Sequence, residues 1–419
     1  MATPGYELVH DALDYDRAAA SIAQGEGYPY SRRPGRETAF RPPAYPVLLA
    51  GAYTLAGVGA AEVDERVLVG RILGVLIGTL IVALIGVVAA QLWGRGVALV
   101  AMALAAVYVP LITVGGAVMS EPLFAALMLG ALAAAIEHRR SAHRWRWALL
   151  AGVLAGLSIL TRANAMVLLL PLALAVWTGR PRFSPRALAV PAVLVVLALL
   201  TVSPWTIRNA VVFDRFIPVS TQLGSALAGT YNDEARTDEE NPASWRSIRR
   251  VKAYESLYAR LREIPEPEVE DILRERSRAY IREHPTYVAK VALWTTLRTF
   301  ELGGLDWSRH TASTISVTPR WANAGVFCFW IFALLAFAGA LTRRAREAPL
   351  WFWAVPALLY LSVAFLVVET PRYRTGIDPF IILLAALALR PALRAVADRA
   401  RPRRDRARYP TSRKDPTPA

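Results

Sequence analysis

The sequence predicts an all-α protein that crosses a membrane many times. The chain has 419 residues, of which 55% are hydrophobic and 19% are charged, and its mean hydropathy is +0.33. Segments such as 72–93 and 187–201 are long and almost free of charge, and about 20 apolar residues span a hydrocarbon core of roughly 30 Å. A soluble enzyme, a fibrous repeat and a disordered chain are therefore excluded.

Nine apolar segments are candidates for transmembrane helices, namely residues 67–92, 97–118, 121–137, 147–161, 164–178, 187–206, 321–341, 350–368 and 377–391. Arginine gathers in four connections, which are residues 138–146, 180–186 and 343–346 and the segment from Arg390 onward. Short basic loops stay on the cytoplasmic side of a membrane. Counting spans from these loops places the alternate connections on the outer side.

This orientation divides the chain into five predicted parts. They are an outer loop with juxtamembrane helices at 1–66, a bundle of six spans at 67–206, a large extracytoplasmic loop at 207–320, three spans at 321–391, and a basic, disordered cytoplasmic tail at 392–419. The apolar stretch 44–61 starts on the outer side, so it is expected to lie along the interface instead of crossing. The large loop is expected to form two or three amphipathic helices over the outer face.

The first residues of the chain carry no signal peptide, because neither a basic stretch nor an apolar core opens the sequence. An outer N-terminus of this kind predicts a missing span upstream. The chain is then expected to be a fragment, or its start to be placed too late.

The sequence indicates no cofactor or metal of its own. Its five histidines show no spacing that builds a zinc site, and a divalent cation is compatible with the sequence but not indicated by it. No GxxxxGK[ST] or strand-borne GxGxxG motif is evident, which argues against a nucleotide-sugar donor. The net charge of +15 comes almost entirely from arginine, and arginine with alanine in such excess indicates a GC-rich genome more than a nucleic-acid partner.

Five arginines stand out because they lie at the outer ends of spans or beside the interfacial stretch, against the positive-inside bias. They are Arg41, Arg162, Arg208, Arg372 and Arg374. Guanidinium groups bind phosphate oxygens through two parallel hydrogen bonds and stay charged in a low dielectric. The set therefore predicts a site for an anionic headgroup. The alternative is that each arginine reaches to lipid phosphate or pairs with a local acid.

Acidic residues recur near these arginines. They are Asp11, Asp14 and Asp16 before the helical stretch 17–24, Glu37 four residues before Arg41, and Glu121 at the start of a span. A carboxylate beside arginines in a partly dry site can act as a general base. Alternatively, Asp14 or Asp16 caps the helix, and Glu121 favours a helix N-terminus through the helix dipole.

Short motifs that contain these residues follow one another along nearly the whole chain. They are Asp11-x-x-x-Tyr15, Arg41-Pro42-Pro43, Ser120-Glu121-Pro122-Leu123, Thr161-Arg162, Pro204-Trp205-x-x-Arg208-Asn209 and Arg372-Tyr373-Arg374. Their order and common outer location resemble the bacterial GT-C glycosyltransferases, the superfamily of protein O-mannosyltransferases and lipid A aminoarabinose transferases. The resemblance implies a GT-C-like bundle of about nine transmembrane helices without the family's first helix.

The resemblance also implies roles for particular residues. An aspartate of the first outer loop is the family's catalytic base, and Asp11 is the position that fits. Ala12 follows where many members carry a second acid, so Asp14 is expected to take that place. Arg41, just before the paired prolines, matches the family's phosphate contact. The further site candidates are Tyr15, Glu37, Glu121, Arg162, Asn209 and Tyr373.

Together these observations predict an inverting hexosyl or pentosyl transferase of the bacterial inner membrane, with its active site facing outward. The expected donor is a polyprenyl-phosphate sugar, and the expected acceptor is a glycan, a lipid or a protein. Asp11 would deprotonate the acceptor hydroxyl, while Arg41, Arg208, Arg372 and Arg374 would stabilise the departing lipid phosphate.

Two other classes of function compete with this one. A transporter or flippase for an anionic lipid-linked glycan would also need outward arginines, although its typical charge at mid-membrane and its related halves are not evident in the sequence. A non-catalytic assembly subunit is the third alternative.

Overall fold

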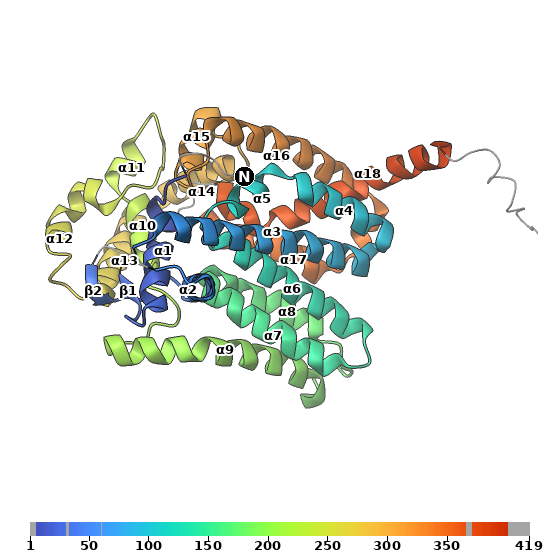
Figure 1. Cartoon of the computed structure of the whole chain (residues 1–419), viewed down its shortest axis with the longest axis horizontal. Coiled ribbons are helices and arrows are strands. Elements are labelled where there is room, and N and C mark those ends of the chain that lie inside the picture. The colour runs from blue at the N-terminus through green and yellow to red at the C-terminus, as the bar shows by residue number, and fades with distance from the viewer. Residues whose placement is uncertain (1–5, 31–32, 60, 366–370, 401–419) are drawn as a thin grey trace, which may run out of the picture.

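The structure, a computed structural model, describes residues 6–30, 33–59, 61–365 and 371–400 (Figure 1). Within these ranges every element is a helix apart from one antiparallel pair of short strands, β1 (Pro29–Tyr30) and β2 (Arg33–Glu37). The all-α fold class predicted from the sequence is therefore confirmed. The small hairpin was not predicted.

Long apolar helices lie side by side and make up the body of the molecule (Figure 1). They are α3 (Val63–Trp93), α4 (Arg95–Val107), α5 (Val109–Gly115), α6 (Glu121–Arg140), α7 (Arg144–Thr161), η1 (Ala163–Leu168) with α8 (Leu169–Val176), α9 (Pro185–Phe213), α16 (Pro319–Ala340), α17 (Leu350–Ala364) and α18 (Asp378–Ala400). Each of the nine predicted spans coincides with one of these helices or with a consecutive pair.

Four of the described helices, α3, α6, α9 and α16, are long and apolar enough to cross a membrane alone. The pair α4 and α5, in the predicted span 97–118, passes the same test as a pair but is bent by 59°. The break falls at Tyr108, whose backbone is extended, because Pro110 cannot donate to a continuing helix and restricts the residue before it. The number of crossings stays a prediction.

Helix α6 forms the centre of the bundle, where it packs against α3 on one side and α7 on the other. Alanine lines most of its buried surface, and 78% of its most apolar window is buried. Small residues let neighbouring helices approach closely. The same device joins α16 to α18, where a Cβ on Gly339 would collide with the carbonyl oxygen of Leu384.

Two helices of the N-terminal part pack on each other at one end of the bundle, α1 (His10–Ala23) and α2 (Ala44–Ala56). Helix α2 buries Tyr45, Leu49 and Tyr53 and ends at Gly57, whose φ of 67° suits a left-handed helix end. With 13 residues it is too short to cross a bilayer core of roughly 30 Å. It occupies the stretch for which an interfacial position was predicted.

The region 207–320 contains more helices than the two or three that were predicted. They are α10 (Leu223–Thr230), α11 (Asp233–Thr237), α12 (Glu255–Ala259), α13 (Glu266–Glu283), α14 (Pro285–Thr299) and α15 (Leu305–Ser313). Periodicity detects long amphipathic helices such as α13, whereas eight residues or fewer hold too little of the pattern to detect. Helices α10 to α13 gather beyond α1 and α2 at the same end of the bundle, whereas α15 packs against α16 (Figure 1).

The C-terminal boundary also differs from the prediction. Helix α18 continues to Ala400, so residues 392–400 are helical and not part of a disordered tail. Residues 391–400 are rich in alanine and arginine, which are good helix formers that extend the preceding apolar helix. The rest of the predicted tail, 401–419, lies outside the described residues.

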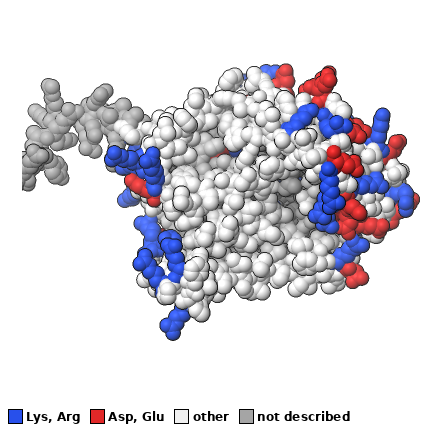
Figure 2. All heavy atoms as spheres, turned by 180° about the vertical axis from the view of Figure 1, so that it is seen from behind, with Lys and Arg blue, Asp and Glu red and all other residues white. Residues whose placement is uncertain are grey.

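Charged side chains lie at the two ends of the molecule and leave a broad uncharged belt between them (Figure 2). One end shows mostly lysine and arginine, and the other mixes both signs (Figure 2). An uncharged belt of this kind is what a lipid bilayer requires. The strongly basic end contains the short arginine-rich loops, as the positive-inside bias predicts for a cytoplasmic face.

Candidate active site

Charged residues from five segments that are distant in the sequence meet at one end of the bundle. They come from α1, from the loop after β2, from the facing ends of α6 and α7, and from η5 (Pro371–Gly376). The group consists of Asp11, Asp14, Arg41, Glu121, Arg162 and Arg372, and is called the charge centre below. Its members were all singled out from the sequence.

Asp11 is the most strongly engaged member of the charge centre. Its Oδ1 accepts a hydrogen bond from Arg41, and its Oδ2 accepts one from Arg372 at 2.5 Å. Arg41 also donates to Asp14 at 3.0 Å. The side chains of Asp11, Arg41 and Arg372 are 22%, 13% and 12% exposed, so the centre is mostly buried and Asp11 is the most accessible of the three.

Glu121 extends the charge centre in the other direction. Its Oε1 lies 3.0 Å from Arg162 and 3.7 Å from Arg372, and its side chain is only 2% exposed. Acids and arginines therefore alternate from Asp14 through Glu121 to Arg162. With three of each, the opposite charges balance.

Tyrosine rings hold the guanidinium groups in place. The guanidinium carbons of Arg162 and Arg372 lie 4.6 and 5.1 Å from the centroid of the Tyr373 ring, within the range of cation–π attraction. Tyr15 hydrogen-bonds Ser120 at 3.0 Å, and its ring lies 5.4 Å from the guanidinium carbon of Arg41. Both predicted tyrosines thus line the charge centre.

The electrostatic surroundings keep Asp11 ionised. Burial alone would raise the pKa of its carboxyl group, but the guanidinium groups of Arg41 and Arg372 outweigh burial and hold that pKa well below its usual range. Asp11 is consequently a carboxylate at every physiological pH.

The helix-capping alternative for the acids of the first outer loop does not hold. Helix α1 begins at His10, and its N-cap is Val9 without a side-chain cap, so Asp14 and Asp16 lie within the helix. Asp16 instead accepts two hydrogen bonds from Arg66, both at 2.9 Å. Arg66 was not predicted as a partner, because it lies inside the predicted outer part and has no neighbouring motif.

Arg208 lies in a separate pocket and not in the charge centre. Its guanidinium pairs with Glu37 and donates to the carbonyl of Thr38 at 2.8 Å and to Asn209 at 3.0 Å. The sequence spacing placed Glu37 near Arg41, whereas in the structure Glu37 pairs with Arg208. Asn209 is buried and donates onward to the carbonyl of Ile217.

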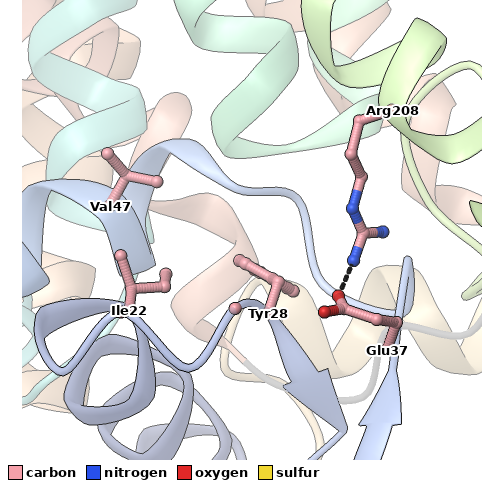
Figure 3. Close-up of a pocket in the computed structure, with 7 residues that line it drawn as sticks. Ile22, Tyr28, Glu37, Val47 and Arg208 are labelled. Atoms are coloured by element: carbon pink, nitrogen blue, oxygen red, sulfur yellow. Dashed lines mark hydrogen bonds and ion pairs between the residues drawn. The ribbon is translucent and has the colours of Figure 1, made fainter.

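This pocket has a volume of about 390 Å³ and opens between α1, α2 and α9 (Figure 3). Ile22 and Val47 lie on one side, and the Arg208–Glu37 pair on the other, with Tyr28 between them (Figure 3). The hydroxyl of Tyr28 donates to the carbonyl of Arg41 at 3.2 Å. The pocket therefore shares a wall with the loop that carries Arg41.

Arg374 belongs to a sealed network next to the charge centre. It donates to Asp378 at 2.8 Å and to the carbonyl of Thr299 at 2.5 Å, and it lies 3.7 Å from Glu301. Tyr108 also donates to Asp378, at 3.0 Å. Sequence analysis grouped Arg374 with the phosphate-binding arginines and missed its partners, although Asp378 four residues later was a detectable signal.

A metal centre is not apparent in the part of the chain that the structure describes. No group of three or more histidine, cysteine, aspartate or glutamate side chains is placed to hold an ion there. The acids of the charge centre face arginines instead.

Comparisons with known proteins identify the class of this architecture. A family model described as dolichyl-phosphate-mannose-protein mannosyltransferase matches residues 41–207, whereas no curated protein matches the chain by sequence. The archaeal oligosaccharyltransferase AglB from Archaeoglobus fulgidus, in complex with an inhibitory peptide and a dolichol-phosphate, has a TM-score of 0.52 at 14% identity, over 96% of this chain and 49% of that chain.

Two further solved structures are similar. The Archaeoglobus fulgidus oligosaccharyltransferase in the apo form has a TM-score of 0.54 at 13% identity, over 96% of this chain and 50% of that chain. ArnT from Cupriavidus metallidurans bound to undecaprenyl phosphate has a TM-score of 0.42 at 17% identity, over 94% of this chain and 75% of that one. The chain spans about half the length of the oligosaccharyltransferase chains.

The chain shares its fold with the oligosaccharyltransferase, and residues 41–207 match the mannosyltransferase family model. Both similarities agree with the GT-C superfamily that the sequence motifs predict. The matched range 41–207 begins at Arg41 and includes Glu121 and Arg162 of the charge centre.

Proposed function

We propose that the protein is an integral membrane glycosyltransferase that moves a sugar from a polyprenyl-phosphate carrier to an acceptor at the outer face of the bacterial inner membrane. The observation that carries this proposal is the carboxylate of Asp11 held between Arg41 and Arg372. The description of the matched family names a dolichyl-phosphate-mannose donor. The similar oligosaccharyltransferase was solved with a dolichol-phosphate, which is a lipid of the same chemical class.

The proposed reaction uses the two kinds of charge in the centre differently. The acceptor hydroxyl attacks the anomeric carbon while Asp11 takes its proton, and the bond from that carbon to the phosphate oxygen breaks with its electron pair on the phosphate. The lipid phosphate leaves with one more negative charge than it had in the donor. Arg41, Arg162 and Arg372 stabilise that charge, which develops in the transition state. Attack opposite the leaving group inverts the anomeric carbon.

The low pKa of Asp11 is compatible with a role as general base if donor binding makes the carboxylate more basic. A strongly stabilised carboxylate is a weak base, but its guanidinium partners can share their hydrogen bonds with a phosphate. Once the donor phosphate takes part of that stabilisation, Asp11 becomes more basic. Proton removal is thus coupled to donor binding. Asp14, Tyr15, Glu121 and Tyr373 hold the arginines in place for this exchange.

The other candidate residues take different roles in the proposal. Arg208, with Glu37 and Asn209, shapes the neighbouring pocket and supports the loop before Arg41, while Arg374 stabilises the fold around η5. The acceptor is a glycan, a lipid or a protein, which the charge centre does not distinguish.

The proposal is tested with the full chain in lipid nanodiscs. A panel of polyprenyl-phosphate sugars and a cell-envelope fraction are added, and release of polyprenyl phosphate with sugar transfer is followed by mass spectrometry. The expected result is release that depends on both donor and acceptor. Donor binding without release across the panel would favour a transporter or an assembly subunit.

The orientation is tested with single cysteines in a Cys328→Ser background. Glu239 lies in the outer region and Ala142 in a basic loop, and both are exposed. An impermeant maleimide added to intact cells should label Glu239→Cys and spare Ala142→Cys. The opposite pattern would invert the topology and contradict an outward active site.

A further inference from the structure

The loop that carries Arg41 is hydrogen-bonded to the outer helix α13 through the carboxylate of Glu266. Glu266, the first residue of α13, accepts hydrogen bonds from the Thr38 hydroxyl at 2.6 Å, the Ala39 amide at 3.0 Å and the Thr221 hydroxyl at 2.6 Å. Thr38 and Ala39 lie more than 220 residues before Glu266 in the chain. The four residues are called the Glu266 clasp below.

The Glu266 clasp is part of a tightly bonded segment. Thr38, Ala39 and Thr221 are 3%, 0% and 4% exposed, and the Thr221 amide donates to the carbonyl of Ala39 at 3.0 Å. Arg208 donates to the carbonyl of Thr38 from the other side. Arg41 follows two residues after Ala39, and Tyr28 holds its carbonyl. The backbone before and at Arg41 therefore has few alternative positions.

We infer that Glu266 is a positioning residue for Arg41. Through this role Glu266 links the outer helices to the charge centre. The expected effect of Glu266 on catalysis rests on the proposed function. Glu266 itself touches no member of the charge centre and acts through the peptide backbone from Ala39 to Arg41. An arginine that must meet both Asp11 and a phosphate needs its backbone placed to within a fraction of an ångström, and a shift of about 1 Å can cost as much as 10²-fold in rate.

Helix-dipole stabilisation does not account for this residue. Glu266 and Glu268 both lie in the first turn of α13, where any carboxylate is favoured. Glu268 is exposed, whereas Glu266 receives three hydrogen bonds from two other segments. Three donors also explain why a carboxylate is needed, because its two oxygens can accept them all. Glu268→Gln is therefore a matched control.

The first test follows the loop itself by amide hydrogen exchange of the full chain in nanodiscs. Glu266→Ala should raise exchange in peptides covering 36–41 by at least about tenfold, since it removes a charge-assisted bond from the Ala39 amide. Glu266→Gln keeps one carbonyl acceptor and should show a smaller rise, and Glu268→Gln should match the unmodified protein. Unchanged exchange in a folded Glu266→Ala protein would overturn the inference.

The second test asks whether the effect passes through Arg41, with undecaprenyl phosphate as the probe. Glu266→Ala should weaken binding about tenfold, and Glu266→Gln should restore part of the loss. In an Arg41→Ala background Glu266→Ala should cost nothing further, because the residue it positions is gone. A purely structural role would add its full loss in both backgrounds and would overturn the inference.

The two proposals can fail separately. If the unmodified protein does not bind undecaprenyl phosphate, the proposed donor is wrong, and the same double-mutant cycle is run on melting temperature. Coupling between Glu266→Ala and Arg41→Ala there supports the clasp without any ligand, while additive losses contradict it.

Discussion

Two arginines on one short helix have opposite surroundings. Arg372 and Arg374 both lie in η5, yet their side chains are 12% and 1% exposed. Arg372 is shared between Asp11 and Glu121, which lie in other parts of the chain. Arg374 is enclosed by Asp378, Glu301 and the carbonyl of Thr299, and its guanidinium carbon lies 3.7 Å from the centroid of the Phe329 ring.

The difference separates a group arranged for chemistry from one arranged for folding. A sealed ion pair cannot exchange its partner for a ligand without exposing a buried charge, which is costly. In the proposed function Arg372, which is 12% exposed and is shared by two carboxylates, exchanges part of that pairing for a phosphate oxygen. We therefore assign donor binding, as part of the proposed function, to the more accessible Arg372 and not to Arg374.

The largest expected effect is on turnover at the open centre. Asp11→Asn keeps the size of the side chain but cannot accept the acceptor proton, so sugar transfer by the folded protein should fall about 10² to 10⁴-fold. The measurement is transfer from a polyprenyl-phosphate sugar by well-folded protein, with Asp14→Asn as comparison. Near-normal transfer by Asp11→Asn with collapse in Asp14→Asn would move the base to Asp14.

The next effect is on stability of the sealed network. Asp378→Asn removes the main partner of Arg374 and leaves a buried guanidinium undercompensated, which should destabilise the protein by about 3 kcal/mol. Asp14→Asn in the charge centre should cost less, because Arg41 keeps Asp11 as a charged partner. Thermal unfolding in detergent compares the two variants. Equal losses would mean that the two regions do not differ as their burial indicates.

A smaller effect is expected when the charge of Arg372 is kept and its shape is changed. Arg372→Lys loses the planar fork that can engage Asp11 and a phosphate together, so donor affinity should weaken about tenfold. Binding of a polyprenyl phosphate to nanodisc-embedded protein measures this. Arg309→Lys, in an exposed pair with Asp306, is the control. Equal donor affinity in both variants would return Arg372 to a purely structural role.

The smallest expected effect is on the pH dependence of stability. It concerns Glu270, a buried carboxylate that is not held between two arginines as Asp11 is. Burial raises the pKa of Glu270 to about 7, against the lowering effects of the Gly224 amide and Arg274, whereas the paired arginines lower that of Asp11. Between pH 4.5 and about 7 the folded state binds more protons at Glu270 than the unfolded state does. Stability should therefore fall as pH rises through this window.

Glu270→Gln should remove that part of the pH dependence and raise stability at pH 8 by about 1 to 2 kcal/mol. Melting temperature measured from pH 5 to about 8 in both proteins provides the comparison, with Glu268→Gln as control. An identical slope before and after the substitution would show that Glu270 titrates normally.

The sequence by itself determined the fold class and the position of most apolar helices. Hydropathy is a property of each residue that can be summed over a segment. A segment such as 187–206 is therefore predicted to be a transmembrane helix from its own sequence. The motifs also indicated the superfamily and every member of the charge centre, including Asp11 and Glu121. Arginines at the outer ends of spans, against the positive-inside bias, can be recognised from the sequence without knowing their ion-pair partners.

Only the tertiary structure decided which charges meet. Glu37 lies four residues from Arg41 in sequence but pairs with Arg208, and Arg374 follows Arg372 by two residues but is buried against Asp378 instead of Asp11. The Glu266 clasp joins positions more than 220 residues apart, for which no spacing rule exists. An ion pair depends on a separation of a few ångströms between side chains, and that separation is set by how distant helices pack.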